Sequence, residues 1–185
     1  MPHITLSFWS GIKDSFEQRT IPSKTVLLNE GEVAKNLYYI EKGCLRLYFY
    51  NEGKDITFQF FFEESIVASF DSMYAGQPSL FSLESIEPTT IRTVSKKDFY
   101  DLVNKRPEAK QEYEHKIIDR FHTYQKLFLS RIKNTPQQRY EELLKEYPHI
   151  FNRNYLVSIR TWYSVDAHLH QQSGGVAISL FEELE

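Results

Sequence analysis

The sequence predicts an α+β fold in which short strands build a small barrel or sandwich and helices flank it. Residues 26–95 hold short runs rich in β-branched and aromatic residues, and glycine-containing turns separate these runs. Residues 107–134 carry a long apolar stripe at helical spacing. Short strands with regular turns argue against a parallel sheet with crossover helices, so adjacent strands are expected to pair antiparallel.

Residues 1–20 are expected to form a helix. Their apolar residues recur at helix-like spacing, at Leu6, Trp9, Ile12 and Phe16. The polar segment TIPSK follows, and its Pro22 ends the pattern because proline removes a backbone donor that a helix needs.

Seven strands are expected next. They are VLL (26–28), LYYI (37–40), CLRLYFY (44–50), ITFQFFF (56–62), SIVA (65–68), SLFSLESI (79–86) and TTIRTVS (89–95). The segment NEGKD (51–55) is expected to close a hairpin, because Gly53 supplies the positive φ that a tight turn needs. The aromatic residues of the segment 36–62 are expected to lie mostly in the core.

Three helices are expected after the strands. The first is KKDFYDLVNKRP (96–107), which stops before Pro107, and the second covers 107–134. The stripe of the second helix consists of Tyr113, Ile117, Phe121, Tyr124 and Phe128. Such a stripe needs a partner, so one part is expected to cover the strands and the rest to pair with the same helix of a second subunit. The third covers 135–148 and has Thr135 as its N-cap.

Composition narrows the possible function classes. The chain has 185 residues, of which 41% are apolar, and its single cysteine excludes an internal disulfide. No apolar run approaches the roughly 20 residues that span a bilayer. The N-terminal segment lacks a basic start followed by an apolar block, so it does not indicate a secretory signal. We expect a cytoplasmic protein that does not enter a membrane.

No catalytic residue, cofactor or metal site is predicted. The sequence has no glycine-rich phosphate loop, and Cys44 lies in an apolar run that is typical of a buried, inert thiol. His168 and His170 are spaced to share a strand face, but no thiolate or carboxylate cluster accompanies them. A cupin-like metal enzyme needs histidines on its strands, and residues 26–95 contain none. An enzyme is therefore not expected.

The segment NLYYIEKGCLRLYFYNEGKDITFQFF (36–61) resembles the Crp/Fnr family of transcription regulators. A strand and turn of the form LYYI-x-x-G precede a hairpin with a G-K-D tip, and the resemblance covers roughly residues 10–150. It implies a double-stranded β-helix over residues 1–106, which is the jelly-roll-like, cyclic-nucleotide-binding β-roll that senses an effector. It also implies a long dimerisation helix over 107–134 and a DNA-binding domain within 135–185.

The resemblance places an effector pocket under the roll. In members that bind cyclic nucleotides, a glutamate holds the ribose hydroxyl and a later arginine neutralises the phosphate. Ser69 and Ser79 stand at these two positions here, and no lysine or arginine occurs between Lys54 and Arg92. A buried phosphate needs a cation, so cyclic AMP is not the expected effector.

The pocket that the resemblance implies is lined by Ser69, Phe70, Ser79, Leu80, Tyr124 and Gln125. Asp71 and Glu84 would make it neutral or slightly acidic. Two interpretations stay open at this stage. The pocket binds an unknown effector that is uncharged or weakly acidic, or it is packed shut and the protein is a structural dimer.

The resemblance also implies a homodimer, with a seam formed by Tyr113, Ile117, Phe121 and Phe128. From about residue 152 the sequence no longer fits the family. Residues 154–185 hold one arginine against four acidic residues, which accounts for the whole net charge of −3. A DNA-reading helix is basic, so DNA binding by this chain is not expected. The tail is either a diverged segment or the product of a frameshift.

Overall fold

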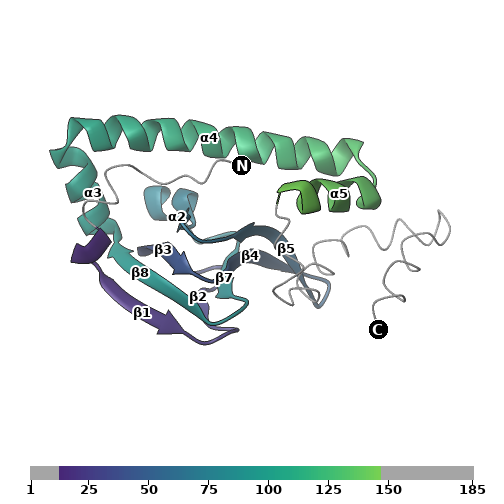
Figure 1. Cartoon of the computed structure of the whole chain (residues 1–185), viewed down its shortest axis with the longest axis horizontal. Helices are drawn as coiled ribbons and strands as arrows, with labels where there is room; N and C mark the ends of the chain where they lie inside the picture. Colours follow the sequence, from purple (N-terminus) through teal and green to yellow (C-terminus); the bar gives the residue numbers. More distant parts are fainter. Residues whose placement is uncertain (1–12, 147–185) are drawn as a thin grey trace. The chain divides into compact units, whose positions relative to one another are not determined.

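The computed structural model describes residues 13–146 (Figure 1). The chain divides after Phe121 into two units. The elements of the first unit are η1 (Lys13–Ser15), β1 (Glu17–Ile21), β2 (Val26–Leu28), β3 (Asn36–Lys42), β4 (Leu45–Asn51), β5 (Lys54–Phe61), β6 (Ile66–Val67), α2 (Phe70–Ala75), β7 (Ser82–Ser85), β8 (Thr89–Ser95), α3 (Lys96–Lys105) and the first part of α4 (Pro107–Lys133). The second unit contains the rest of α4, followed by α5 (Pro136–Glu146).

The strands form two antiparallel sheets, with the orders β1-β8-β3-β6 and β2-β7-β4-β5. This arrangement, with flanking helices, confirms the predicted α+β roll. The predicted strand runs all contain a strand, although β7 occupies only Ser82–Ser85 of the run 79–86. The three predicted helices are also present as α3, α4 and α5 within the described residues.

The expected N-terminal helix is wrong over its last residues, where the chain forms β1. This strand pairs with β8 from Glu17, opposite Thr93, to Ile21, opposite Thr89. A partner strand more than 60 positions away satisfies the backbone groups here, and such tertiary pairing overrides a local helical pattern. Residues 1–12 of the expected helix lie outside the described residues.

The hairpin between β4 and β5 closes through a two-residue turn. Glu52 and Gly53 both have positive φ, of 49° and 80°, as a type I′ turn requires. Further along the hairpin, Leu47 lies opposite Gln59 while Tyr48 lies opposite Thr57. Phe58 is therefore an extra residue in β5, which makes a β-bulge.

The sheet β2-β7-β4-β5 has two unlike faces. We call the face of Leu45, Leu47 and Leu83 the core face, because these side chains belong to the main hydrophobic cluster. The alternate residues, which include Arg46 and Glu84, define the opposite face. Most aromatic side chains of the 36–62 segment are buried, as predicted: Tyr38, Tyr39, Tyr48, Phe60, Phe61 and Phe62.

The segment after β6 contains a short helix, α2, that the sequence analysis missed. It ends at Gly76, which has a φ of 68° and whose N–H donates to the carbonyl of Ser72. The hydroxyl of Ser72 accepts a hydrogen bond from the N–H of Ala34 at 3.0 Å. These bonds fix α2 to the segment between β2 and β3. Within residues 13–146, no helix is both long and apolar enough to cross a membrane.

Candidate effector site

The two serines at the positions of the family's glutamate and arginine lie against each other. Ser69 precedes α2 and Ser79 precedes β7, and both side chains are buried. The hydroxyl of Ser79 donates to the oxygen of Ser69 at 2.9 Å. The hydroxyl of Ser69 in turn donates to Oδ1 of Asp71 at 3.0 Å, rather than capping α2.

The N–H of Phe81 extends this chain of hydrogen bonds, since it donates to the oxygen of Ser79 at 3.2 Å. Each hydroxyl has one hydrogen to give, so the chain uses both of them. Ser79 can also turn its hydrogen to the carbonyl of Phe81, at 2.7 Å. The two serines therefore hold each other in place. They lack the charges with which the family's usual glutamate and arginine bind the ribose hydroxyl and the phosphate.

The backbone of Ser79 is fixed as well. Its N–H donates to the carbonyl of Glu32 and its carbonyl accepts from the N–H of Gly31, both at 2.8 Å. The next residue, Leu80, is 67% exposed, so the structure places it at the surface rather than among the buried residues. Its role in effector binding stays a prediction.

Phe70, the first residue of α2, faces the long helix. Its ring centroid lies 6.5 Å from that of Tyr113. Arg120, two helical turns beyond Tyr113, places its guanidinium 4.7 Å from the ring centroid of Phe61 and 6.0 Å from that of Phe70. Arg120 thus connects the core face of β5 with α2.

Sequence reasoning missed Arg120 because it counted charges only between Lys54 and Arg92. The spacing contained the signal: Arg120 follows Tyr113 by seven positions and therefore lies on the same side of α4. An arginine on the side of a helix that covers aromatic strands is placed to stack on their rings.

Tyr113 itself packs on the roll side of α4. Its ring meets Phe99 at 5.2 Å and Tyr100 at 6.5 Å between centroids. Burial, together with the neighbouring Tyr100 hydroxyl, raises the pKa of Tyr113. Tyr113 therefore belongs to the part of the stripe that covers the strands, and its part in a dimer seam stays a prediction.

The next stripe residues of α4 are exposed. In the first unit, Ile117 is 48% and Phe121 is 60% exposed, and Ile118 beside them is also exposed. In the second unit, Phe128 is exposed in the same way. Tyr124 and Gln125 also lie in the second unit, and their approach to the pocket stays a prediction.

Gln59 is a further residue that the sequence analysis missed. It is the polar residue in the run FQFFF (58–62), and only 8% of its surface is exposed. It lies opposite Leu47, so its side chain shares the core face. Its Oε1 atom is buried and has no hydrogen-bond partner.

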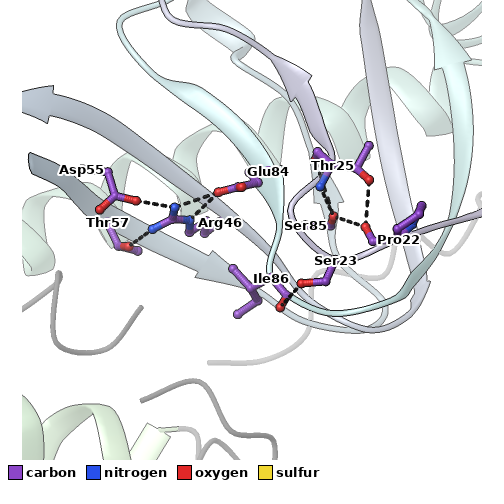
Figure 2. A network of polar contacts seen from close by, with 9 residues as sticks. All are labelled: Pro22, Ser23, Thr25, Arg46, Asp55, Thr57, Glu84, Ser85 and Ile86. Carbon is purple, nitrogen blue, oxygen red and sulfur yellow. Dashed lines mark hydrogen bonds and ion pairs between the residues drawn. The ribbon is translucent and has the colours of Figure 1, made fainter. Parts of the chain in front are cut away.

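The opposite face of the same sheet holds a polar network around Arg46 (Figure 2). Its guanidinium donates to Glu84, to Thr57 and, by a short bond, to Asp55. It also lies 4.4 Å from the ring centroid of Tyr48. Burial opposes the charge of Arg46, but the hydrogen bonds to Asp55 and Glu84 outweigh it and raise the arginine pKa.

This network corrects the expectation that Glu84 makes the pocket acidic. Glu84 lies opposite Arg46 in the pairing of β7 with β4, so it belongs to the face away from the core. Its carboxylate is neutralised there by the arginine, at 2.7 Å. Within residues 13–146, no group of three or more His, Cys, Asp or Glu side chains is arranged to hold a metal ion.

Residues 18–106 match the sequence family described as the cyclic nucleotide-binding domain. Residues 18–106 form a cyclic nucleotide-binding domain. The match covers all strands except the first residue of β1, and it ends one residue before α4 begins. A search of curated proteins gives no match to the chain.

Solved structures share the fold of this cyclic nucleotide-binding domain. The catabolite activator protein of Thermus thermophilus has a TM-score of 0.57 at 17% identity, over 69% of this chain and 60% of that protein. A transcriptional regulator from Thermotoga maritima has a TM-score of 0.57 at 14% identity, over 68% of this chain and 98% of that one. The sensor domain of the regulator DNR from Pseudomonas aeruginosa has a TM-score of 0.52 at 18% identity, over 67% and 79%.

These structures confirm the predicted resemblance at the level of the fold. The domain is like the sensor domains of Crp/Fnr-type regulators in its roll and in the long helix that follows. The chain matches 60% of the length of the Thermus thermophilus protein.

Proposed function

We propose that this chain is the effector-sensing and dimerisation part of a Crp/Fnr-type transcription regulator. The observation that carries the proposal is the order of its parts. A cyclic nucleotide-binding domain leads directly into the 27-residue helix α4, which presents Ile117 and Phe121 as exposed apolar residues. Such a helix needs a partner along its apolar side, and a second copy of the chain supplies one.

The effector binds under the roll and shifts α4, in this proposal. Tyr113 packs against Phe70 at the start of α2, and Arg120 stacks over Phe61 and Phe70. A ligand that moves α2 or β5 therefore changes the contacts of α4 directly. It biases the position of the long helix only to the extent that it binds one arrangement better than the other.

The effector is not cyclic AMP. Ser69 and Ser79 are uncharged and bind each other, and Asp71 at the end of their hydrogen-bond chain repels an anion. We expect cyclic AMP to leave the melting temperature of the protein unchanged. The double variant Ser69→Glu with Ser79→Arg restores the family's pair of charges, and it is expected to gain stabilisation by cyclic AMP. Stabilisation of the unmodified protein by cyclic AMP would contradict this reading of the pocket.

Dimerisation is tested on the exposed residues of α4. Phe121→Asp places a charge on the apolar side and is expected to convert a dimer into a monomer, measured by analytical ultracentrifugation. Gln111→Asp, at an exposed position of the same helix, is the matched control and is expected to stay dimeric. A monomeric unmodified protein at micromolar concentration would refute the dimer.

The closed structural dimer is the second candidate, favoured by the direct bond between Ser69 and Ser79. A thermal-shift screen against nucleotides and small metabolites separates the two candidates. Stabilisation by a compound supports the sensor, and a dimer that no compound stabilises supports the structural protein.

DNA binding is tested apart from sensing, because the unusual tail from about residue 152 lies outside the described residues. We propose that the chain as given does not bind DNA, since residues 154–185 carry excess negative charge. A titration over a range of salt concentrations, beside a variant with a family-type winged helix after Arg153, is the test. A steep salt dependence for the unmodified chain would refute the proposal. Reading the nucleotide sequence in all three frames beyond codon 150 tests the frameshift hypothesis.

A further inference from the structure

The amide of Gln59 is a polar group whose burial the fold alone does not explain. The side chain lies among core residues, and its Oε1 atom is buried there without a hydrogen-bond partner. A buried acceptor without a donor costs about 1–3 kcal/mol. A leucine or methionine of similar size would avoid this cost. The amide is therefore at a place where a donor from another molecule would restore the missing hydrogen bond.

The β-bulge in β5 places an aromatic ring beside this amide. Phe58, the extra residue of the bulge, stacks on Phe81 with their ring centroids 4.9 Å apart. Phe81 also meets Phe49, two positions beyond the core-face residue Leu47, at 6.1 Å. Phe58 and Gln59 therefore both lie on the core side of the sheet. Bulges often occur where a strand must re-aim a side chain toward a site.

The same surroundings connect Gln59 to the two serines and to the long helix. The N–H of Phe81 donates to the hydroxyl of Ser79, which links the aromatic pair to the serine chain. Two residues from Gln59 along β5, the ring of Phe61 carries the guanidinium of Arg120. The two neighbours of Gln59 along β5, Phe58 and Phe61, therefore contact the serine chain's aromatic pair and the long helix respectively.

The charges near this amide favour a neutral ligand. Arg120 is a cation on this side, where its guanidinium lies over the rings of Phe61 and Phe70, whereas Arg46 belongs to the opposite face of the sheet. Asp71, at the end of the serine chain, carries the opposite charge, so the two charges on this side offset each other. Aromatic rings offer flat faces to a planar ligand, and a glutamine amide pairs with an N–H donor that stands beside a ring acceptor, as in adenine.

We propose that Gln59 is the recognition point for an uncharged, planar heterocycle that carries an N–H donor beside a ring nitrogen. This assignment rests on the proposed sensing function and names the chemical class of its effector. The Oε1 atom accepts the ligand's N–H, and the aromatic rings around the bulge contact its faces. Because the atom is buried, a ligand reaches it only when the elements above the core face move, and α4 contacts this face through Arg120.

Adenosine and adenine are suitable probes, with cyclic AMP as the charged counterpart of adenosine. We expect adenosine or adenine to raise the melting temperature of the unmodified protein and cyclic AMP to have no effect. Gln59→Leu, with Gln59→Met as a second variant of similar volume, removes the acceptor. Each is expected to raise the melting temperature of the protein alone and to weaken probe binding about tenfold or more by calorimetry.

Thr93→Val is the matched control, because Thr93 also has a buried hydroxyl without a partner but lies on the other sheet, opposite Tyr38. It is expected to raise the melting temperature and to leave probe binding unchanged. The inference is overturned if both probes fail to stabilise the unmodified protein, or if the Gln59 variants bind them as well as it does. After either result, the proposed sensing function still stands if another compound stabilises the protein. The sensing proposal fails if no compound in the wider screen stabilises the protein.

Discussion

The two faces of the sheet β2-β7-β4-β5 differ in whether a buried polar side chain has its hydrogen-bond partners. On the opposite face, Arg46 has hydrogen bonds to Glu84, Asp55 and Thr57. On the core face, the Oε1 atom of Gln59 has no partner. A satisfied network is consistent with a structural role alone. An unsatisfied amide lowers stability, so its presence is better explained by a contact with a ligand.

The largest expected effect comes from breaking the satisfied network. Arg46→Met leaves Glu84 buried without its cation, and removing one partner of a buried ion pair costs about 3–5 kcal/mol. We expect the urea midpoint of unfolding to fall accordingly, with an unchanged slope. Asp55 is more exposed than Glu84 and can regain water, so Glu84 accounts for most of the loss.

The double variant Arg46→Met with Glu84→Leu is the control for this prediction. It removes the stranded carboxylate, and apolar replacement of both partners of a buried ion pair is often neutral. We expect it to recover most of the lost stability. If the double variant is as unstable as the single one, the loss comes from packing, and the two faces do not differ in the way described.

The sequence predicted the parts of this comparison that depend on local patterns. Runs of β-branched and aromatic residues located the strands, and Gly53 located the hairpin turn, because strand formation and turn geometry are properties of neighbouring residues. The strand β1 was missed because its pairing with β8 is long-range. Local periodicity contains no information about such a partner.

The candidate site was predictable only where the family resemblance supplied positions. It named Ser69 and Ser79, whose hydroxyls the structure brings together at 2.9 Å, and their part in effector binding stays a prediction. The resemblance did not predict that Glu84 pairs with Arg46 outside the pocket. These two residues are 38 positions apart and meet only through sheet pairing. Gln59 was missed because a register shift, visible only in the paired strands, decides what stands beside it.

A smaller effect is expected on the core side, from Ser79→Ala. The change removes the acceptor of the Phe81 N–H and the donor to Ser69. Phe81 is only half-buried, so water can replace part of the loss, and we expect a cost of about 1–2 kcal/mol in urea unfolding. Leu80→Ser, at the exposed neighbouring position, is the control and should change stability by less than about 0.5 kcal/mol. Equal effects of the two changes would show that the serine chain is not part of a buried structure.

The smallest expected effect concerns Tyr113, which joins the core side to α4. Burial raises its pKa above the ordinary value of 10.0, so the folded protein keeps the phenol proton at a pH where the unfolded chain has lost it. The stabilising contribution is complete below about pH 10 and declines as the pH rises toward the folded-state pKa. Tyr113→Phe has no proton to lose, so its free energy of unfolding should decline less steeply above pH 10 than that of the unmodified protein. Tyr38, Tyr39 and Tyr48 also have raised pKa values, so some decline should persist in the variant. Parallel curves for the two proteins would mean that water reaches the Tyr113 hydroxyl, and that α4 does not seal the roll at Phe70.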